Sequence, residues 1–218
     1  MARLERHEGV RIRATEVDLE ADLGLPAGAT GVVILGTSAT ASEPAGEPIV
    51  ETLEEAGLGV LQLSLLSDRE LHEEGVTGEL GMNFELIARR ILAARNWLRE
   101  SGVPGLPAGY LASGTAVSAA LVAASQEPED VQAVVARDGL PELSRDRLGS
   151  VTAPTLLLVS SDDPLVKLLN ESAFDELPGE KELRLVPARP VGSGEPGTAD
   201  EVAALTRDWF LRFLAPVE

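Results

Sequence analysis

Residues 109–120 read GYLASGTAVSAA, the most informative segment of the chain for its architecture. The apolar residues up to Ala112 are typical of a buried strand, and the alanine-rich residues from Ala116 onward favour a helix. The residues between them, Ser113 to Thr115, are small enough for a tight turn that brings strand and helix close together. The stretch therefore predicts a strand, a turn and a helix, with Gly114 at the tip of the turn.

The same unit recurs along the chain. Short apolar runs predict buried strands, and the segments between them have the spacing of amphipathic helices. Residues 10–24 alternate apolar and polar positions, which predicts an antiparallel edge hairpin. The acidic residues 67–81 are interpreted as a long crossing loop or a short cap. The order predicts a single α/β domain over residues 1–218, a doubly wound and mainly parallel sheet whose ligand lies at the carboxyl ends of its strands.

Composition limits the partners and the compartment. The formal net charge of -18 repels nucleic acid and anionic lipid surfaces, so neither is expected as a partner. The chain has no cysteine, which removes disulfides and thiolate ligands, and no spacing of the kind that binds metals or nucleotides is present. We expect neither a cofactor nor a metal. No apolar run reaches the roughly 18 residues of a membrane span, so a soluble cytoplasmic protein is expected.

The order and spacing of the elements resemble the α/β-hydrolase fold and, within it, the dienelactone-hydrolase-like family, with an N-terminal antiparallel edge hairpin and a minimal cap. The resemblance covers nearly the whole chain and is carried by stretches that include GVVILGTSATAS, GYLASGTAVSAALVAAS and APTLLLVSSDDPLV. Such proteins usually carry His-Gly after the first central strand, Gly-x-Ser-x-Gly at the nucleophile turn, an acid after a later strand and a histidine after the last strand.

The resemblance implies that two members of the catalytic triad are missing. The nucleophile position falls at Gly114, and the position nearest the family histidine is Val191. The chain has only two histidines, His7 and His72, and both precede the turn. The acid position survives as Asp163, which has no histidine to orient. A standard serine-hydrolase mechanism is therefore not expected.

The oxyanion-binding part of the site depends on backbone rather than side chains. Thr37 and Ser38 occupy the His-Gly position, and amides near Ser38 and Thr115 can still form an anion-stabilising nest. The Thr115 hydroxyl is interpreted as a local hydrogen-bonding group at the helix start. Ser113 is a candidate displaced nucleophile, although a buried, backbone-bonded serine is favoured because its side chain should alternate away from the pocket.

Charged residues after the later strands supply the remaining candidates. Asp163 and Asp138 are candidate acid or base groups, while Asp163 also fits ordinary turn chemistry and Asp138 can simply pair with Arg137. Arg189 stands in the loop that should have held the histidine and could bind an anionic group of a substrate, although a solvated loop arginine is the default interpretation. We assign Thr37, Ser38, Ser113, Gly114, Thr115, Arg189 and Val191 to the expected small-molecule site.

Three functions remain open at this point. The first is a repurposed enzyme that binds a small molecule and promotes a non-hydrolytic step such as cyclisation, elimination or isomerisation. The second is a catalytically inactive binding or scaffold protein that serves a partner or forms a homodimer. The third is a hydrolase that uses a carboxylate-activated water or Ser113. The first is slightly favoured, because the small residues around Gly114 leave room above the turn.

Overall fold

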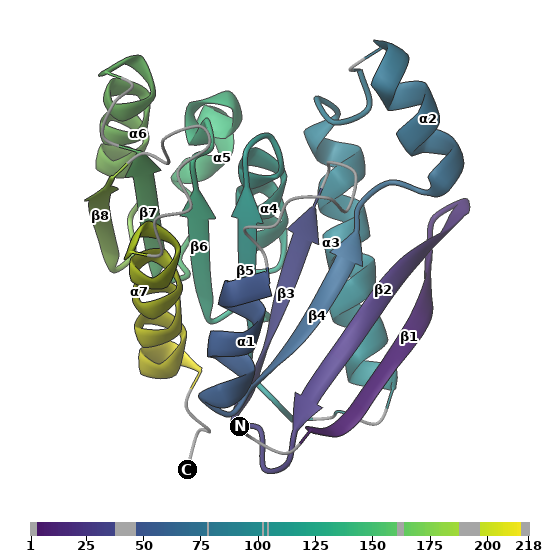
Figure 1. Ribbon diagram of the computed structural model, residues 1–218. Coiled ribbons are helices and arrows are strands. Elements are labelled where there is room, and N and C mark those ends of the chain that lie inside the picture. The colour runs from purple at the N-terminus through teal and green to yellow at the C-terminus, as the bar shows by residue number, and fades with distance from the viewer. Residues whose placement is uncertain are drawn as a thin grey trace.

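The computed structural model describes residues 4–37, 47–77, 79–101, 103, 105–160, 164–187 and 197–214. They form one eight-stranded sheet with the strand order β1-β2-β4-β3-β5-β6-β7-β8 (Figure 1). The strands are β1 Leu4–Ala14, β2 Val17–Pro26, β3 Gly31–Thr37, β4 Leu58–Ser64, β5 Ala108–Ser113, β6 Ala133–Arg137, β7 Thr155–Ser160 and β8 Lys181–Val186. The expected α/β class is confirmed.

The hairpin and the parallel strands lie where the sequence places them. Strands β1 and β2 pair antiparallel, β2 continues antiparallel onto β4, and the ladders from β4 through β3 to β8 are parallel. The parallel strands therefore end together, at the top of Figure 1. This common end is where ligands bind in sheets of this kind.

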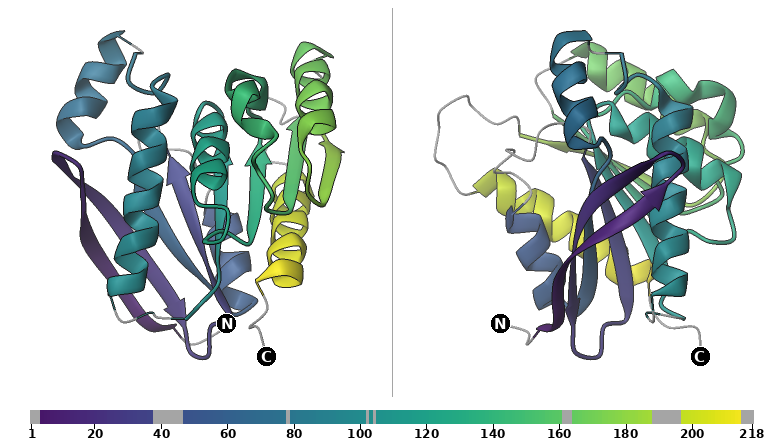
Figure 2. Two further views of the ribbon diagram at one scale, coloured as in Figure 1. Left: turned by 180° about the vertical axis from the view of Figure 1, so that it is seen from behind. Right: turned by 90° about the vertical axis from the view of Figure 1, so that its right-hand side faces the viewer.

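Helices cover both faces of the sheet. The helices are α1 Glu47–Glu55, α2 Asp68–Thr77, α3 Phe84–Glu100, α4 Ala116–Gln126, η1 Pro141–Ser144, α5 Arg145–Leu148, α6 Pro164–Glu176 and α7 Gly197–Phe213. One face carries α1 and α7, and the other carries α3 to α6 (Figure 2). Each layer buries its own apolar cluster against the sheet. Burial on both faces explains why the central strands are continuous apolar runs.

The acidic segment before α3 contains a helix. Residues 68–77 form α2, so of the two expected alternatives, a long crossing loop and a short cap, the loop is wrong. The signal was Ser67-Asp-Arg-Glu70, a capping box in which the Ser67 N–H donates to the Glu70 carboxylate at 2.9 Å. Residues 141–148, between β6 and β7, form the short helices η1 and α5. Four-residue helices are too short to leave a periodic pattern.

Candidate functional site

The turn after β5 has the geometry expected of a nucleophile turn. Gly114 has φ +59°, its N–H donates to the carbonyl of Arg137 at 3.1 Å, and its carbonyl accepts from the N–H of Val117 at 3.3 Å. A Cβ placed on Gly114 would have no described atom within 4 Å beyond its chain neighbours. The tip of the turn is exposed. Glycine holds this backbone without strain, and among the described residues it leaves space above the turn.

The flanks of this turn are tightly packed. Ala112 and Ala116 are each 1% exposed, as the close approach of β5 and α4 requires. The side chain of Thr115 makes no capping hydrogen bond to α4. The first turn of α4 carries no acidic residue. The positive end of the α4 dipole is therefore not neutralised from within its own first turn.

The side chain of Asp138 holds the neighbouring turn, which follows β6. Asp138 has φ +48°, a conformation that aspartate tolerates better than most residues. Its Oδ1 accepts from the backbone N–H of Ser160 at 2.9 Å and from the Ser160 hydroxyl at 2.7 Å. Its Oδ2 lies 3.3 Å from Nε of Arg137, which confirms the expected pairing. The carboxylate thus joins the end of β6 to the end of β7.

Two buried polar side chains hold the backbone that follows Asp138. The Ser118 hydroxyl on α4 donates to the carbonyl of Leu140 at 2.8 Å. The Asn170 amide on α6 donates to the carbonyl of Gly139 at 3.0 Å. Ser118, Asn170 and Ser160 are not among the residues that the sequence predicts for the site. For Ser118 the available signal was a polar residue on a helix that is otherwise buried, because such a group needs a partner.

A buried ion pair anchors the start of α2 beside the carboxyl end of β4. Arg90 is 2% exposed and donates to the Leu65 carbonyl at 2.7 Å and to Oε1 of Glu70 at 2.6 Å. Burial raises the pKa of Glu70, but hydrogen bonds from Arg90 and Ser67 outweigh that effect and lower the pKa overall. The pair fixes α2 against α3 at the edge of the site.

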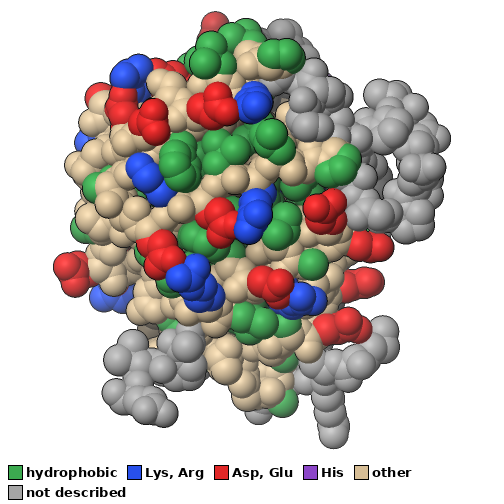
Figure 3. All heavy atoms as spheres, turned by 90° about the vertical axis from the view of Figure 1, so that its left-hand side faces the viewer, with side chains coloured by type: hydrophobic (Ala, Val, Ile, Leu, Met, Phe, Trp, Pro, Cys, Tyr) green, Lys and Arg blue, Asp and Glu red, His purple; other side chains and the backbone are tan. Residues whose placement is uncertain are grey.

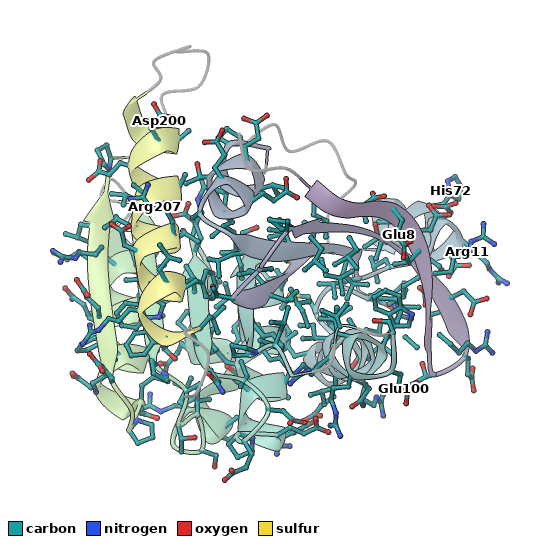
Figure 4. All side chains as sticks on the ribbon, turned by 90° about the horizontal axis from the view of Figure 1, so that it is seen from below. Glu8, Arg11, His72, Glu100, Asp200 and Arg207 are labelled. Atoms are coloured by element: carbon teal, nitrogen blue, oxygen red, sulfur yellow. The ribbon has the colours of Figure 1, made fainter. Side chains whose placement is uncertain are left out.

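The sheet brings five of the predicted site residues to one end. Thr37 closes β3, whose Gly36 lies beside Ala112, and Ser113 lies beside Arg137. Thr37, Ser113, Gly114, Thr115 and Asp138 therefore share the carboxyl end of the central strands. Ser38, Asp163, Arg189 and Val191 lie outside the described residues. His72 is exposed on α2 and lies at the periphery of the molecule, on the side away from α7 (Figure 4).

A separate cavity of about 240 Å³ lies between the β1–β2 hairpin and the start of α2. Its lining is mostly charged or hydroxylic and includes Arg11, Asp18, Glu20 and Arg69. Arg11 and Arg69 have side chains that are 77% and 87% exposed. Ligand sites are usually lined by apolar walls with a few polar groups, so this cavity is a weaker candidate than the Gly114 turn.

Two other classes of site find no support in the described part of the chain. No group of three or more His, Asp or Glu side chains there could hold a metal ion. None of the helices described is both long and apolar enough to cross a bilayer.

Comparison with known proteins places the fold firmly. A dienelactone hydrolase from Anabaena variabilis is 36% identical, with a TM-score of 0.89, and the alignment covers 96% of this chain and 98% of that one. An esterase from Pyrococcus furiosus is 14% identical with a TM-score of 0.75, over 96% of this chain and 94% of that one, and shares the fold. No family model matches the sequence.

Two longer curated proteins also match this chain. Two Mycobacterium tuberculosis proteins, provisionally named as phosphoribosyl transferases, are 35% identical over 212 residues. The match covers 96% of this chain but 47% of the relatives, so the chain spans about half their length.

Proposed function

This chain belongs to the dienelactone hydrolase family of α/β-hydrolase-fold proteins, and from that premise we propose that it binds a small molecule over Gly114 and promotes a non-hydrolytic step. The observation that carries the proposal is the Gly114 turn, which keeps the backbone of a nucleophile position, with φ +59°, and open space in place of a side chain. Cyclisation, elimination and isomerisation depend on positioning and proton transfer and need no covalent nucleophile.

The α4 N-terminus supplies the electrostatic part of such a step. Removing a proton next to a carbonyl group places negative charge on the carbonyl oxygen, as attack on an ester does. Backbone N–H groups and the positive end of the α4 dipole stabilise that oxygen in both reactions. Substrates of this site are therefore small carbonyl compounds, such as unsaturated lactones or oxo acids.

The proton must be moved by a carboxylate. Both oxygens of Asp138 are already engaged, with Ser160 and Arg137, so Asp138 positions the site and does not act as the base. We assign the base to Asp163, which follows β7 in the family's acid position. Arg189 serves as the group that binds an anionic part of the substrate.

Product mass distinguishes this proposal from hydrolysis. The protein is incubated with dienelactone, related unsaturated lactones and p-nitrophenyl acetate, and the products are analysed by mass spectrometry. We expect an isomer, or a product lacking a leaving group, from a carbonyl substrate, and no release of p-nitrophenol above the buffer rate. A fluorophosphonate should label no residue. A product carrying one added water, or an adduct on Ser113, would establish hydrolysis by an activated water or a displaced serine instead.

Two substitutions test the place of the reaction. Gly114→Leu fills the open space over the turn and should abolish turnover, while Met82→Leu is a matched control because Met82 is exposed before α3. Asp163→Asn should lower kcat with little change in KM, because it removes the base and keeps the shape. Turnover that survives Gly114→Leu would place the reaction elsewhere.

A second candidate is a binding module that serves a phosphoribosyl transferase. The curated relatives carry as much chain again beyond the matched half, and their name describes a chemistry different from that of hydrolase-fold proteins. In this reading the other half of those proteins is the transferase and the present domain is its partner. Separately expressed, that half should bind this chain in isothermal titration calorimetry, and an absence of heat would remove this candidate.

A further inference from the structure

Among the described residues, the outer side of β8 is an unpaired sheet edge. β8 is the last strand in the sheet order, and within the described residues only β7 pairs with it. Figure 3 shows this side of the molecule, with apolar side chains flanked by acidic and basic ones. Unpaired edges usually carry a bulge, a proline or an outward lysine that blocks pairing with another strand.

β8 has neither a bulge nor a proline along its length, and Glu182 and Arg184 pair with each other. Its six register pairs with β7 run without interruption from Lys181 to Val186, and Pro187 comes only after the strand ends. The Lys181 ammonium is turned away, because it donates to the carbonyls of Phe174 at 2.6 Å and Leu177 at 2.8 Å at the end of α6. By contrast, the opposite edge strand, β1, has a register irregularity near Leu4 and Arg6.

The register with β7 determines which backbone groups point outward. Thr155 pairs with Lys181, and its N–H donates to the carbonyl of Glu180 at 2.9 Å. In a parallel ladder this means that residues 180, 182 and 184 direct their main chains toward β7. Lys181, Leu183 and Leu185 therefore direct their N–H and C=O groups toward the open side.

The side chains favour one partner for this edge, a second β8. Leu185 is 46% exposed. Glu182 and Arg184 form an ion pair on one face of the strand. In an antiparallel pair centred on Leu183, the Glu182 of one copy lies opposite the Arg184 of the other. A pair centred on Arg184 would place the Arg184 side chains of the two copies opposite each other. It would also need hydrogen bonds from backbone groups that are already bonded to β7.

We propose that two copies of this chain associate through their β8 edges, antiparallel and centred on Leu183. In this arrangement Leu183 pairs with Leu183 of the second copy, and Lys181 pairs with Leu185, which forms about six backbone hydrogen bonds. The two sheets become one continuous sheet, and both exposed Leu185 side chains are covered. The proposal is independent of the chemistry over Gly114.

Sedimentation equilibrium over a concentration series tests the association. The chain has a mass of 22.9 kDa, and we expect a concentration-dependent rise toward twice that value. Leu185→Lys places two lysines opposite each other and should weaken the dimer by about tenfold or more. Met82→Lys makes the same charge change at a side chain that is 49% exposed before α3, and should leave the dimer unchanged.

A charge exchange tests the register. Glu182→Arg and Arg184→Glu should each weaken the dimer, because each places like charges opposite one another. The double variant should restore it, because the opposed charges are again complementary. Thermal unfolding followed by circular dichroism checks that each variant is folded. A single-chain mass at every concentration, equal weakening by Leu185→Lys and Met82→Lys, or no recovery in the double variant would overturn the proposal.

Discussion

The two ends of strand β5 each carry a glycine, and the two glycines serve opposite purposes. At the amino end, a Cβ on Gly109 would lie 2.5 Å from the Phe210 ring and 3.1 Å from the carbonyl of Ala133. At the carboxyl end, a Cβ on Gly114 would have no described atom within 4 Å beyond its chain neighbours. Gly109 allows close packing, whereas Gly114 allows a positive φ and an empty space.

This difference separates the closely packed amino end of β5 from its carboxyl end, where the described residues leave space over the turn. Phe210 on α7 is 0% exposed and packs against the sheet near the start of β5. The turns at the other end instead have two residues in the left-handed region, Gly114 and Asp138. Conformations of this kind persist where surrounding structure holds them and are concentrated at functional sites. Four predictions test the contrast.

The largest effect is expected for Gly109→Ala. The new methyl group must displace Phe210, and overpacking of this kind should lower the free energy of unfolding by about 3 kcal/mol. Urea unfolding measures the loss. The double variant Gly109→Ala with Phe210→Leu should lose less than the sum of the two single variants, because the smaller side chain makes room. Strict additivity would mean that Phe210 is not the obstacle.

Asp138→Ala should be the next most harmful change. It removes an acceptor that binds both donors of Ser160 and leaves alanine at φ +48°, so a loss of about 2 kcal/mol is expected. Asp138→Asn is the matched control, because asparagine tolerates this φ and keeps an acceptor oxygen. Equal losses in the two variants, measured by urea unfolding, would show that the hydrogen bonds to Ser160 contribute little.

Gly114→Ala should cost less than the same substitution at Gly109. Space is available, so only the positive φ opposes the methyl group, and the expected loss is about 1 kcal/mol. Gly114→Asn should be milder still, because asparagine adopts this conformation more easily. A loss as large as that of Gly109→Ala would show that the space over the turn is filled.

The smallest effects concern pH, and they have opposite signs at the two ends of the sheet. The pKa of Glu70, near the carboxyl end, is lowered, so its contribution to stability is present above about pH 4.5 and is lost as the pH falls. Near the amino end, burial first and then its hydrogen bond to Asp130 raise the pKa of Glu127. Glu127 therefore binds a proton more tightly in the folded protein than in the unfolded chain. Its contribution to the stability of the fold decreases as the pH rises above about 4.5.

Glu70→Gln and Glu127→Gln separate these two contributions. Relative to the native chain, Glu70→Gln should be more destabilised at pH 7 than at pH 4. Glu127→Gln should be relatively more stable at pH 7 than at pH 4. Urea unfolding at a series of pH values from 4 to 8 measures both differences, and a shared sign would contradict the opposite environments of the two carboxyl groups.

Periodicity in the sequence was sufficient for the architecture. The apolar runs of β3, β5, β6 and β7 are buried on both faces, so their composition alone indicates central parallel strands. The alternation of β2 has buried and exposed positions in turn, as a half-covered strand requires. By contrast, α2 was missed because its acidic residues hide the helical period, although its capping box was visible.

The site could be predicted only in part. Small residues around Gly114 indicated the turn, since few other residues allow strand and helix to approach so closely. Nothing local to Asp138 indicated that its carboxylate binds Ser160, which is 22 residues away. The same holds for Arg90 and Glu70, which are 20 residues apart and meet only because α3 packs beside the end of β4.

The order of the elements, the turn at Gly114 and the lack of any histidine after residue 72 follow from residue type and spacing along the chain, so they can be predicted before folding is considered. Three features depend on the folded chain: the hydrogen bonds of Asp138 to Ser160, the packing of Phe210 against Gly109, and the unpaired outer side of β8 within the described residues. Hydrogen bonds and close packing depend on distance in space, which folding sets between residues far apart in the chain.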